Sequence, residues 1–264
     1  MQLGLNDKVA IVLAASKGLG RASAEALAAE GAFVTIGARD QSVLEQTAKE
    51  IRDASGSRVL AVPTDVTKVE DIEAIVSATV REFGRVDILV TNAGGPPAGK
   101  FEQFGDEQWL AAFNLNLMST VRLIRQVIPH MRNSGGGRII NIESTSVKQP
   151  IENLLLSNAI RSGVIGLAKT LSSELAADKI TVNNVCPGRM LTDRVRQVYK
   201  INEQVQQGVS EADALQGVAK DIPLGRLGDP SELGALVAFL ASEQAAYITG
   251  TTIQVDGGLV RSLL

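Results

Sequence analysis

Short apolar runs alternate with amphipathic helical stretches along this chain of 264 residues. The apolar runs have the length and composition of buried strands. They span residues 9–13, 33–36, 58–62, 86–90, 138–142 and 180–185. Between them, apolar residues recur three and four positions apart, as Ile72, Ile75, Val76 and Val80 do. Strands separated by single helices are joined by crossover connections, which place the strands parallel. The pattern therefore predicts an α/β fold, a single-domain Rossmann-type doubly wound parallel sheet with helices on both faces.

Local signals mark several helix boundaries. Gly31 is a common C-terminal stop for the Ala-rich helix predicted from Gly18 to Glu30. Thr67 and Glu70 have the spacing of a capping box, so a helix is expected to open there. One long helix is predicted from about residue 106 to residue 131, before a run of three glycines.

A polar segment from about residue 192 to residue 221 follows the sixth predicted strand and has helical character. Such a segment is often a solvated excursion from the domain. Its position at the carboxyl end of a strand equally favours a lid over that edge of the sheet. Both alternatives stay open, and residues 1–264 are otherwise expected to form one domain.

Composition narrows the classes of partner. The chain is 45% hydrophobic and 21% charged, with a net charge of −3 and no run of like charges. These values give no field that would attract nucleic acid or an anionic membrane. No apolar segment approaches the length of a membrane span, and the N-terminus lacks a signal-peptide pattern. We expect a cytoplasmic protein with a small-molecule substrate and no bound metal, and we interpret the single Cys186 as a buried hydrophobic residue.

A glycine-bearing loop lies between the first predicted strand and the first predicted helix. Glycines here let backbone N–H groups approach a pyrophosphate, and the helix N-terminus adds partial positive charge. A tight turn is the alternative explanation of a glycine pair, but the strand-loop-helix placement favours a dinucleotide. The predicted contacts are Ser16, Lys17, Gly18, Leu19 and Gly20.

The end of the second predicted strand bears on the choice of dinucleotide. Gly37-Ala38-Arg39 lacks the acidic residue that would accept hydrogen bonds from an adenosine ribose. Arg39 and Lys17 instead suit a 2′-phosphate, so NADP(H) is predicted in preference to NAD(H). The alternative is that both are solvated surface cations.

Two later segments carry a family resemblance. Asn141-Ile142-Glu143-Ser144 is followed by a helix with Ser157 and Arg161, and thirteen positions separate Ser144 from Ser157. With the glycine loop, this pattern resembles the short-chain dehydrogenase/reductase family, which usually has Asn-Ile-Ser-Ser and then Tyr-x-x-x-Lys. The resemblance covers nearly the whole chain, from Lys8 to Gly258.

The resemblance implies more of the cofactor site. The family would have a Gly at position 14, where this chain has Ala14, so the loop departs from the pattern there. Segments after the third, fourth and sixth strands match the family's adenine, loop-stabilising and nicotinamide motifs. Their residues are Asp65 and Val66; Asn92, Ala93 and Gly94; and Pro187, Gly188 and Thr192.

The resemblance also assigns catalytic positions. In the family, Tyr donates a proton to the substrate carbonyl, Lys binds the ribose and lowers the pKa of Tyr, Ser holds the carbonyl, and Asn anchors a water. Ser144 and Asn116 match the Ser and the Asn. Ser157 and Arg161 stand where Tyr and Lys are expected, and Arg161 keeps a positive charge for the ribose.

The acid of this site is therefore missing from its usual position. An alkyl hydroxyl such as that of Ser157 is far less acidic than a phenol, whose pKa is about 10. Glu143 is a candidate replacement, but strand alternation places it on the face opposite Ser144 and argues against that role. Tyr199 in the 192–221 segment is a second candidate that would have to swing over the site.

The Pro-bearing loop 94–99 and the Ser-x-x-x-Arg sequence together resemble an atypical branch similar to 3-oxoacyl-acyl-carrier-protein reductases. This resemblance implies an NADP(H)-dependent oxidoreductase that acts on a carbonyl or alcohol, with a 3-oxoacyl thioester as one candidate. The alternatives are an NADP(H)-binding sensor or scaffold without turnover, and a reductase for activated substrates that need no strong acid. By the same resemblance we expect a homotetramer, with contacts through the helices near 106–131 and 154–177 and through strand 252–255.

Overall fold

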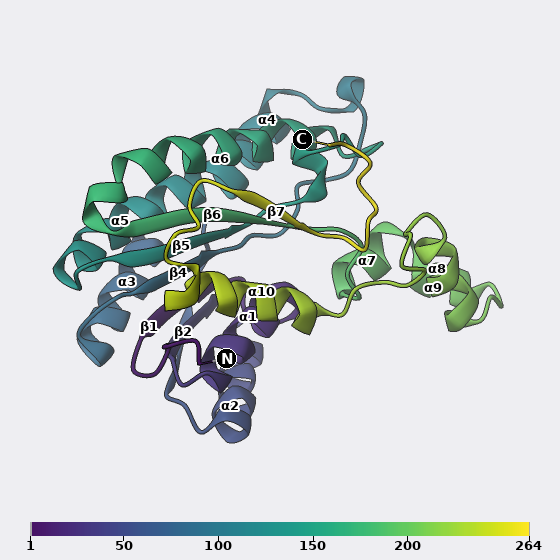
Figure 1. Cartoon of the computed structure of the whole chain (residues 1–264). Coiled ribbons are helices and arrows are strands. Elements are labelled where there is room, and N and C mark those ends of the chain that lie inside the picture. Colours follow the sequence, from purple (N-terminus) through teal and green to yellow (C-terminus); the bar gives the residue numbers. More distant parts are fainter. Residues whose placement is uncertain (1, 264) are drawn as a thin grey trace.

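Seven strands and ten α-helices make up the part of the chain that the computed structural model describes, residues 2–263 (Figure 1). The strands are β1 Val9–Leu13, β2 Phe33–Ala38, β3 Val59–Pro63, β4 Ile88–Thr91, β5 Gly137–Ile142, β6 Ile180–Pro187 and β7 Thr252–Val255. The helices are α1 Gly18–Ala29, α2 Gln41–Ser55, α3 Val69–Phe83, α4 Asp106–Ala112, α5 Ser119–Asn133, α6 Leu155–Glu174, α7 Asp193–Val198, α8 Ile201–Gln206, α9 Glu211–Ala219 and α10 Pro230–Ala241.

The seven strands form one sheet in the order β3-β2-β1-β4-β5-β6-β7, with every neighbouring pair parallel. This arrangement confirms the predicted doubly wound Rossmann-type fold. The chain reverses its direction of winding between β1 and β4, so the crevice at the carboxyl ends of these strands lies where such sheets bind ligands.

Helices cover both faces of the sheet (Figure 1). On one face, Leu27 of α1, Leu44 of α2 and Leu233 of α10 pack in one fully buried core with strand residues such as Val12. On the other face, α3, α5 and α6 bury a second core that includes Leu13. Alternate residues of β1 therefore belong to different cores, as strand geometry requires.

The predicted long helix over residues 106–131 is interrupted. α4 continues into a π-helical segment, Phe113–Met118, which then leads into α5. π-helical turns are often found at functional sites. Here the segment carries Asn116, whose side chain is buried.

The predicted capping box at the start of α3 is wrong. The helix begins at Val69, and its N-cap residue Lys68 makes no side-chain cap bond. Thr67 instead donates both its hydroxyl and its backbone N–H to the Asp65 carboxylate, at 2.7 and 3.0 Å. The Thr67 hydroxyl is thus hydrogen-bonded within the turn that precedes the helix, and it does not cap the N-terminus of α3.

The helical character predicted for residues 192–221 is confirmed by α7, α8 and α9. These three short helices lie together at the end of the sheet where β6 finishes (Figure 1). They share a small core of their own, formed by Ile201, Ala214 and Val218. Within residues 2–263, no helix has the length and apolar character needed to cross a membrane.

Candidate active site

A cavity of about 780 Å³ opens at the carboxyl ends of the central strands. The glycine loop, the segment after β4, the end of β5, α6 and α7 all contribute to its wall. Of the predicted site residues, those lining it are Lys17, Gly18, Leu19, Asn92, Ala93, Gly94, Ser144, Ser157, Arg161, Pro187, Gly188 and Thr192. The remaining predicted residues, Ser16, Gly20, Arg39, Asp65, Val66 and Asn116, lie outside the lining.

The glycine loop leaves the N-terminus of α1 open toward this cavity. Lys17 is the N-cap residue and makes no side-chain cap bond, and the first turn of α1 contains no acidic residue. Uncapped N–H groups with the positive end of the helix dipole are suited to an anion. The observation fits the pyrophosphate of a dinucleotide. The N-cap residue Lys17 adds a side-chain cation at this helix end, 66% exposed and 3.8 Å from Asp193.

Ala14 occupies the tight turn that precedes this helix. Its φ is +48°, in the left-handed region that favours glycine. A Cβ on Gly20 would lie 2.4 Å from the Ala14 carbonyl oxygen, so that position has room only for glycine. The loop therefore keeps its fold with one glycine fewer, at the cost of a strained residue.

The far end of the predicted cofactor site carries Arg39 and Asp65. Arg39 is exposed. The pKa of Asp65 is lowered, mainly by the backbone and side-chain hydrogen bonds from Thr67, with smaller contributions from the charges of Arg39 and Lys68. The Asp65 carboxylate is thus held ionised beside the Arg39 guanidinium.

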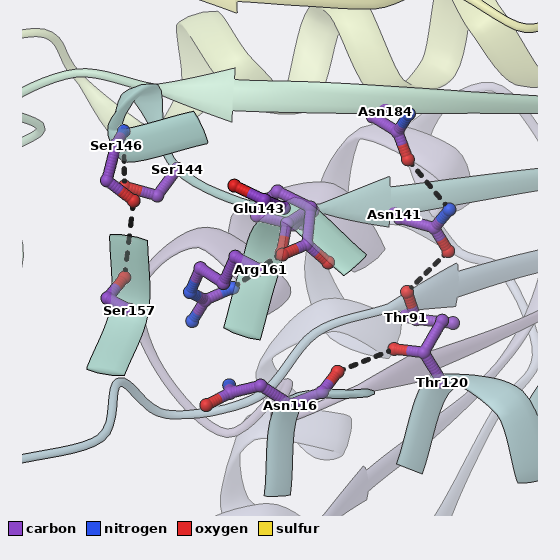
Figure 2. Close-up of polar contacts among 12 residues, drawn as sticks. Thr91, Asn116, Thr120, Asn141, Glu143, Ser144, Ser146, Ser157, Arg161 and Asn184 are labelled. Atoms are coloured by element: carbon purple, nitrogen blue, oxygen red, sulfur yellow. Dashed lines mark hydrogen bonds and ion pairs between the residues drawn. The ribbon is translucent and has the colours of Figure 1, made fainter. Parts of the chain in front are cut away.

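Asn116 reaches the site from the π-helical segment. Its Nδ2 donates to the carbonyl oxygen of Gly94 at 3.0 Å, which fixes the loop after β4. Its backbone carbonyl accepts from the Thr120 hydroxyl (Figure 2). The Oδ1 atom is buried without a partner among the described residues, a geometry that an ordered water would satisfy.

Three serines form a hydroxyl cluster between β5 and α6. Ser144 caps a short 3₁₀ turn by accepting from the backbone N–H of Ser146 at 3.1 Å. The Ser146 hydroxyl lies 3.3 Å from that of Ser157, and either can be the donor (Figure 2). Ser144 and Ser157 both line the cavity, as their predicted roles require.

Arg161 forms a buried ion pair with Glu143. Arg161 Nη1 lies 3.0 Å from Glu143 Oε2, and the two side chains are 8% and 3% exposed (Figure 2). Arg161 stands one turn after Ser157 on α6, and its Nη1 also lies 3.4 Å from the carbonyl oxygen of Ile142. Its guanidinium is therefore held against the end of β5.

The expectation that Glu143 faces away from the site is wrong, because Glu143 and Ser144 both line the cavity. Strand β5 ends at Ile142, so the alternation of side chains between faces does not extend to the next two residues. Burial raises the pKa of Glu143 to about 7, although the charge and hydrogen bond of Arg161 act in the opposite direction. Cys186 is buried as predicted, and burial together with the Glu143 charge raises its thiol pKa to about 12.

Comparisons with known proteins agree with this geometry. The family model described as Enoyl-(Acyl carrier protein) reductase matches residues 13–260. A 3-oxoacyl-acyl-carrier-protein reductase of Vibrio cholerae is 39% identical over 259 residues, 97% of this chain and 99% of the relative. The chain belongs to the short-chain dehydrogenase/reductase family.

Two solved structures of this family are similar over the whole domain. L-sorbose reductase from Gluconobacter frateurii, complexed with NADPH and L-sorbose, has a TM-score of 0.95 and 36% identity, covering 100% of both chains. A variant of actinorhodin polyketide ketoreductase with NADPH has a TM-score of 0.89 and 38% identity, covering 96% of this chain and 97% of that chain. The chain is therefore an oxidoreductase-family member similar to ketoacyl reductases.

A polar network beneath the site was missed from the sequence. Asn141 accepts from the Thr91 hydroxyl at 2.8 Å and donates to Asn184 at 2.9 Å (Figure 2). Asn184 in turn donates to Thr252. These bonds connect the carboxyl ends of β4 and β5 to the middle of β6 and to Thr252 at the start of β7. Thr91, Asn141 and Asn184 are buried, so the network fixes the ends of β4 and β5, from which the short-chain dehydrogenase/reductase site is built.

Helix α7 and the residues beside it close one side of the cavity. Arg194 Nη2 donates to the carbonyl oxygen of Pro96 at 3.1 Å, which connects α7 to the loop after β4. The Arg189 guanidinium lies 5.2 Å from the centre of the Tyr199 ring, and both residues line the cavity. Tyr199 thus contacts the site without the swing that the sequence analysis required.

Proposed function

We propose that this protein is an NADP(H)-dependent oxidoreductase that interconverts a carbonyl and an alcohol with an altered proton-donor site. The observation that carries the proposal is a single cavity lined by the open N-terminus of α1 at one end and by Ser144, Ser157 and Arg161 at the other. In this proposal an anion site and a hydroxyl-bearing site share one dinucleotide-sized space.

The chain offers a place for each part of the cofactor. The N-terminus of α1 and Lys17 would hold the pyrophosphate, the segment 92–94 would hold the middle of the dinucleotide, and Arg161 would hold the ribose hydroxyls. When bound, NADPH supplies a hydride to the substrate. The residues of the segment 187–192 line the same cavity and would surround the nicotinamide.

The preference for NADP(H) rests on charge. Lys17 in the glycine loop and Arg39 directly after β2 are exposed cations, and both would pair with a 2′-phosphate. The two similar structures that contain NADPH support this choice. If Arg39 and Lys17 are instead merely solvated, the two cofactors will bind alike.

The substrate side points to a carbonyl compound. The Ser144 hydroxyl would hold the carbonyl oxygen, and Asn116 Oδ1 would anchor a water near it. The relative from Vibrio cholerae supports a 3-oxoacyl thioester as the substrate, whereas L-sorbose reductase supports a polyhydroxy ketone. A Ser-x-x-x-Arg site in which Ser157 were the only acid would protonate either substrate poorly, because an alkyl hydroxyl is a weak acid.

Two further features remain predictions. A homotetramer is proposed because two large apolar side chains are exposed on α4 and its π-helical continuation. Leu110 is 66% exposed and Phe113 is 39% exposed, as expected of a helix face that a neighbouring subunit covers. A lid role is proposed for residues 192–221, supported by the Arg194 contact across the cavity. The cytoplasmic location stays a prediction from the sequence.

The alternative function is an NADP(H)-binding sensor or scaffold without turnover, which the missing phenol favours. One pair of measurements separates the two functions. NADPH affinity is measured by fluorescence titration, and NADPH oxidation is followed with a panel that includes a 3-oxoacyl thioester, a polyhydroxy ketone and an activated carbonyl. Binding with substrate-dependent oxidation supports the enzyme, binding without oxidation supports the sensor, and failure to bind NADPH contradicts both.

A further inference from the structure

Three departures from the family pattern meet at one wall of the cavity. Position 157 lacks the phenol, position 161 has a guanidinium, and position 143 has a carboxyl group. The structure brings Glu143 and Arg161 into direct contact and leaves Ser157 one helical turn away (Figure 2). A carboxyl group has thus been added to the same site from which a phenol has been lost.

Glu143 is well placed to exist in two protonation states. Two ionisable groups face it within the described chain: Arg161 from α6, which favours the carboxylate, and Cys186 from β6, whose thiol stays protonated at neutral pH. Burial favours the neutral acid, because a desolvated carboxylate is costly. The opposing effects of burial and Arg161 leave the pKa of Glu143 near 7, where a general acid is most effective.

We propose that Glu143 is the proton donor of this site and that Arg161 stabilises the carboxylate formed when the proton leaves. The proposal rests on the proposed function, since it assigns the acid of that reaction. Arg161 acts on the substrate only through Glu143 in this step, so it is a positioning residue there.

The proton transfer balances without a further reactant. The O–H bond of the Glu143 carboxyl group breaks and its electron pair stays on the carboxylate. The π bond of the substrate carbonyl breaks and its electron pair moves to the oxygen, which forms an O–H bond with this proton, while the carbon gains the hydride that the proposed function assigns to NADPH. The carboxylate pairs with Arg161 Nη1 until a proton from solvent restores the acid.

A structural ion pair is the competing explanation, in which Glu143 only orients Arg161 for the ribose. The two explanations differ in what happens on titration. A structural carboxylate stays ionised at every working pH, whereas a proton donor must be neutral below pH 7 and lose its proton above it. Tyr199 is the competing acid, because its phenol lines the same cavity.

The test uses the full-length protein and three variants. Glu143→Gln keeps the shape and can still accept from Arg161 but carries no acidic proton. Glu143→Asp retains an acid and guards against a Gln variant that does not fold. Tyr199→Phe tests the competing acid, since it removes the phenol of another residue that lines the cavity. Circular dichroism and the NADPH dissociation constant show whether each variant keeps its fold and its cofactor site.

Two readouts are recorded from pH 5 to 9. The first is the infrared carbonyl band of a protonated carboxyl group, taken as the difference between wild type and Glu143→Gln without substrate. The second is the pH profile of kcat for the best substrate of the carbonyl panel. We expect a protonated band that disappears as pH rises through about 7, and a wild-type kcat that falls over the same range.

Glu143→Gln is expected to lose about 10²- to 10⁴-fold in kcat with little change in NADPH affinity. Glu143→Asp should retain part of that rate, and in Tyr199→Phe the kcat should still fall as pH rises through about 7. Full activity in Glu143→Gln, or loss of activity in Tyr199→Phe alone, would overturn the proposal. So would a Glu143 carboxylate that stays ionised throughout, which would support the structural ion pair.

Failure of the proposed function has a different signature. If the wild type binds NADPH but none of the carbonyl compounds causes NADPH oxidation, the proposed enzymatic function is refuted. The infrared titration then still decides whether Glu143 holds a proton near neutral pH. The two failures are therefore distinguishable.

Discussion

Replacing Glu143 with Gln should change how the free energy of unfolding depends on pH. In the folded protein burial raises the pKa of Glu143 from 4.5 to about 7. In the unfolded chain the same carboxyl group is solvated and ionises at its ordinary pKa. Between these two values the folded state binds more protons than the unfolded state, so the stability that Glu143 contributes falls as pH rises.

The magnitude follows from the two pKa values. Glu143 contributes its full stability below pH 4.5 and loses it as pH rises through about 7. The interval of about 2.5 pH units, at about 1.36 kcal/mol each, corresponds to on the order of 3 kcal/mol. Arg161 stabilises the carboxylate and so reduces this loss of stability. It does not reverse the loss, because the desolvation of the carboxylate is the larger effect.

Urea unfolding followed by circular dichroism at pH 5, 6, 7 and 8 measures this directly. The quantity of interest is the free energy of unfolding of wild type minus that of Glu143→Gln, at equal protein concentration because an oligomer's stability depends on it. Other carboxylates titrate alike in both proteins and cancel. The difference should fall by up to about 3 kcal/mol from pH 5 to pH 8.

A difference that stays constant from pH 5 to 8 would refute the reasoning, since Glu143 would then be ionised throughout. A difference that grows with pH would show that Arg161 outweighs burial. The free energy of unfolding of Glu143→Gln minus that of the Glu143→Gln, Arg161→Met double variant should not change with pH, because neither protein has a titrating group at position 143. These outcomes are read from stability alone and need no substrate.

Three more predictions concern the cofactor loop and the assembly. Arg39→Asp should weaken NADPH binding at least about tenfold and leave NADH binding unchanged or tighter, as measured by fluorescence titration; equal affinities of wild type for the two cofactors would contradict the charge argument. Ala14→Gly should raise the free energy of unfolding by up to about 1 kcal/mol, because Ala14 has a φ of +48° and Gly relieves that strain at some entropic cost; a less stable variant would show that the turn is not strained. Light scattering at micromolar concentration should give a tetramer that Leu110→Asp dissociates, and a wild-type monomer would exclude this assembly.

The fold was predictable because its signals are local and redundant. Buried parallel strands appear as continuous apolar runs, and the helices between them as residues such as Ile72 and Ile75 at helical spacing. Once strands and helices alternate, right-handed crossovers leave few topologies. The glycine loop was predictable for the same reason, because its position between β1 and α1 is itself part of the signal.

The details of the site depended on geometry that the sequence pattern does not carry. The orientation of Glu143 could not be inferred, because strand alternation applies only while the strand lasts and β5 ends one residue earlier. The capping box at Thr67 failed because Asp65, two residues away, competes for the same hydroxyl. A pairing of Glu143 with Arg161 eighteen positions apart has no sequence period to reveal it.

Restoring the family's acid should make Glu143 dispensable, which is the strongest test of how this site was altered. Ser157 and Arg161 lie four positions apart on α6, both only 7% exposed, and both line the cavity. Adding Ser157→Tyr and Arg161→Lys to the Glu143→Gln variant would place a phenol in the cavity, with an ammonium one turn below to lower its pKa. Ser157→Phe with Arg161→Lys in the same Glu143→Gln background is the matched control, since it adds the ring without the hydroxyl.

We expect the Tyr combination to recover at least about tenfold of the kcat lost in Glu143→Gln, and the Phe combination to recover none. The rate of the Tyr combination should also stay high above pH 7, because a phenol keeps its proton to higher pH than the Glu143 carboxyl group does. Equal recovery by Tyr and Phe would mean that filling the cavity matters more than the proton. No recovery in a Tyr variant that still binds NADPH would mean that α6 no longer directs position 157 toward the substrate. The site would then differ from the usual family site in its geometry as well as in the identity of its acid.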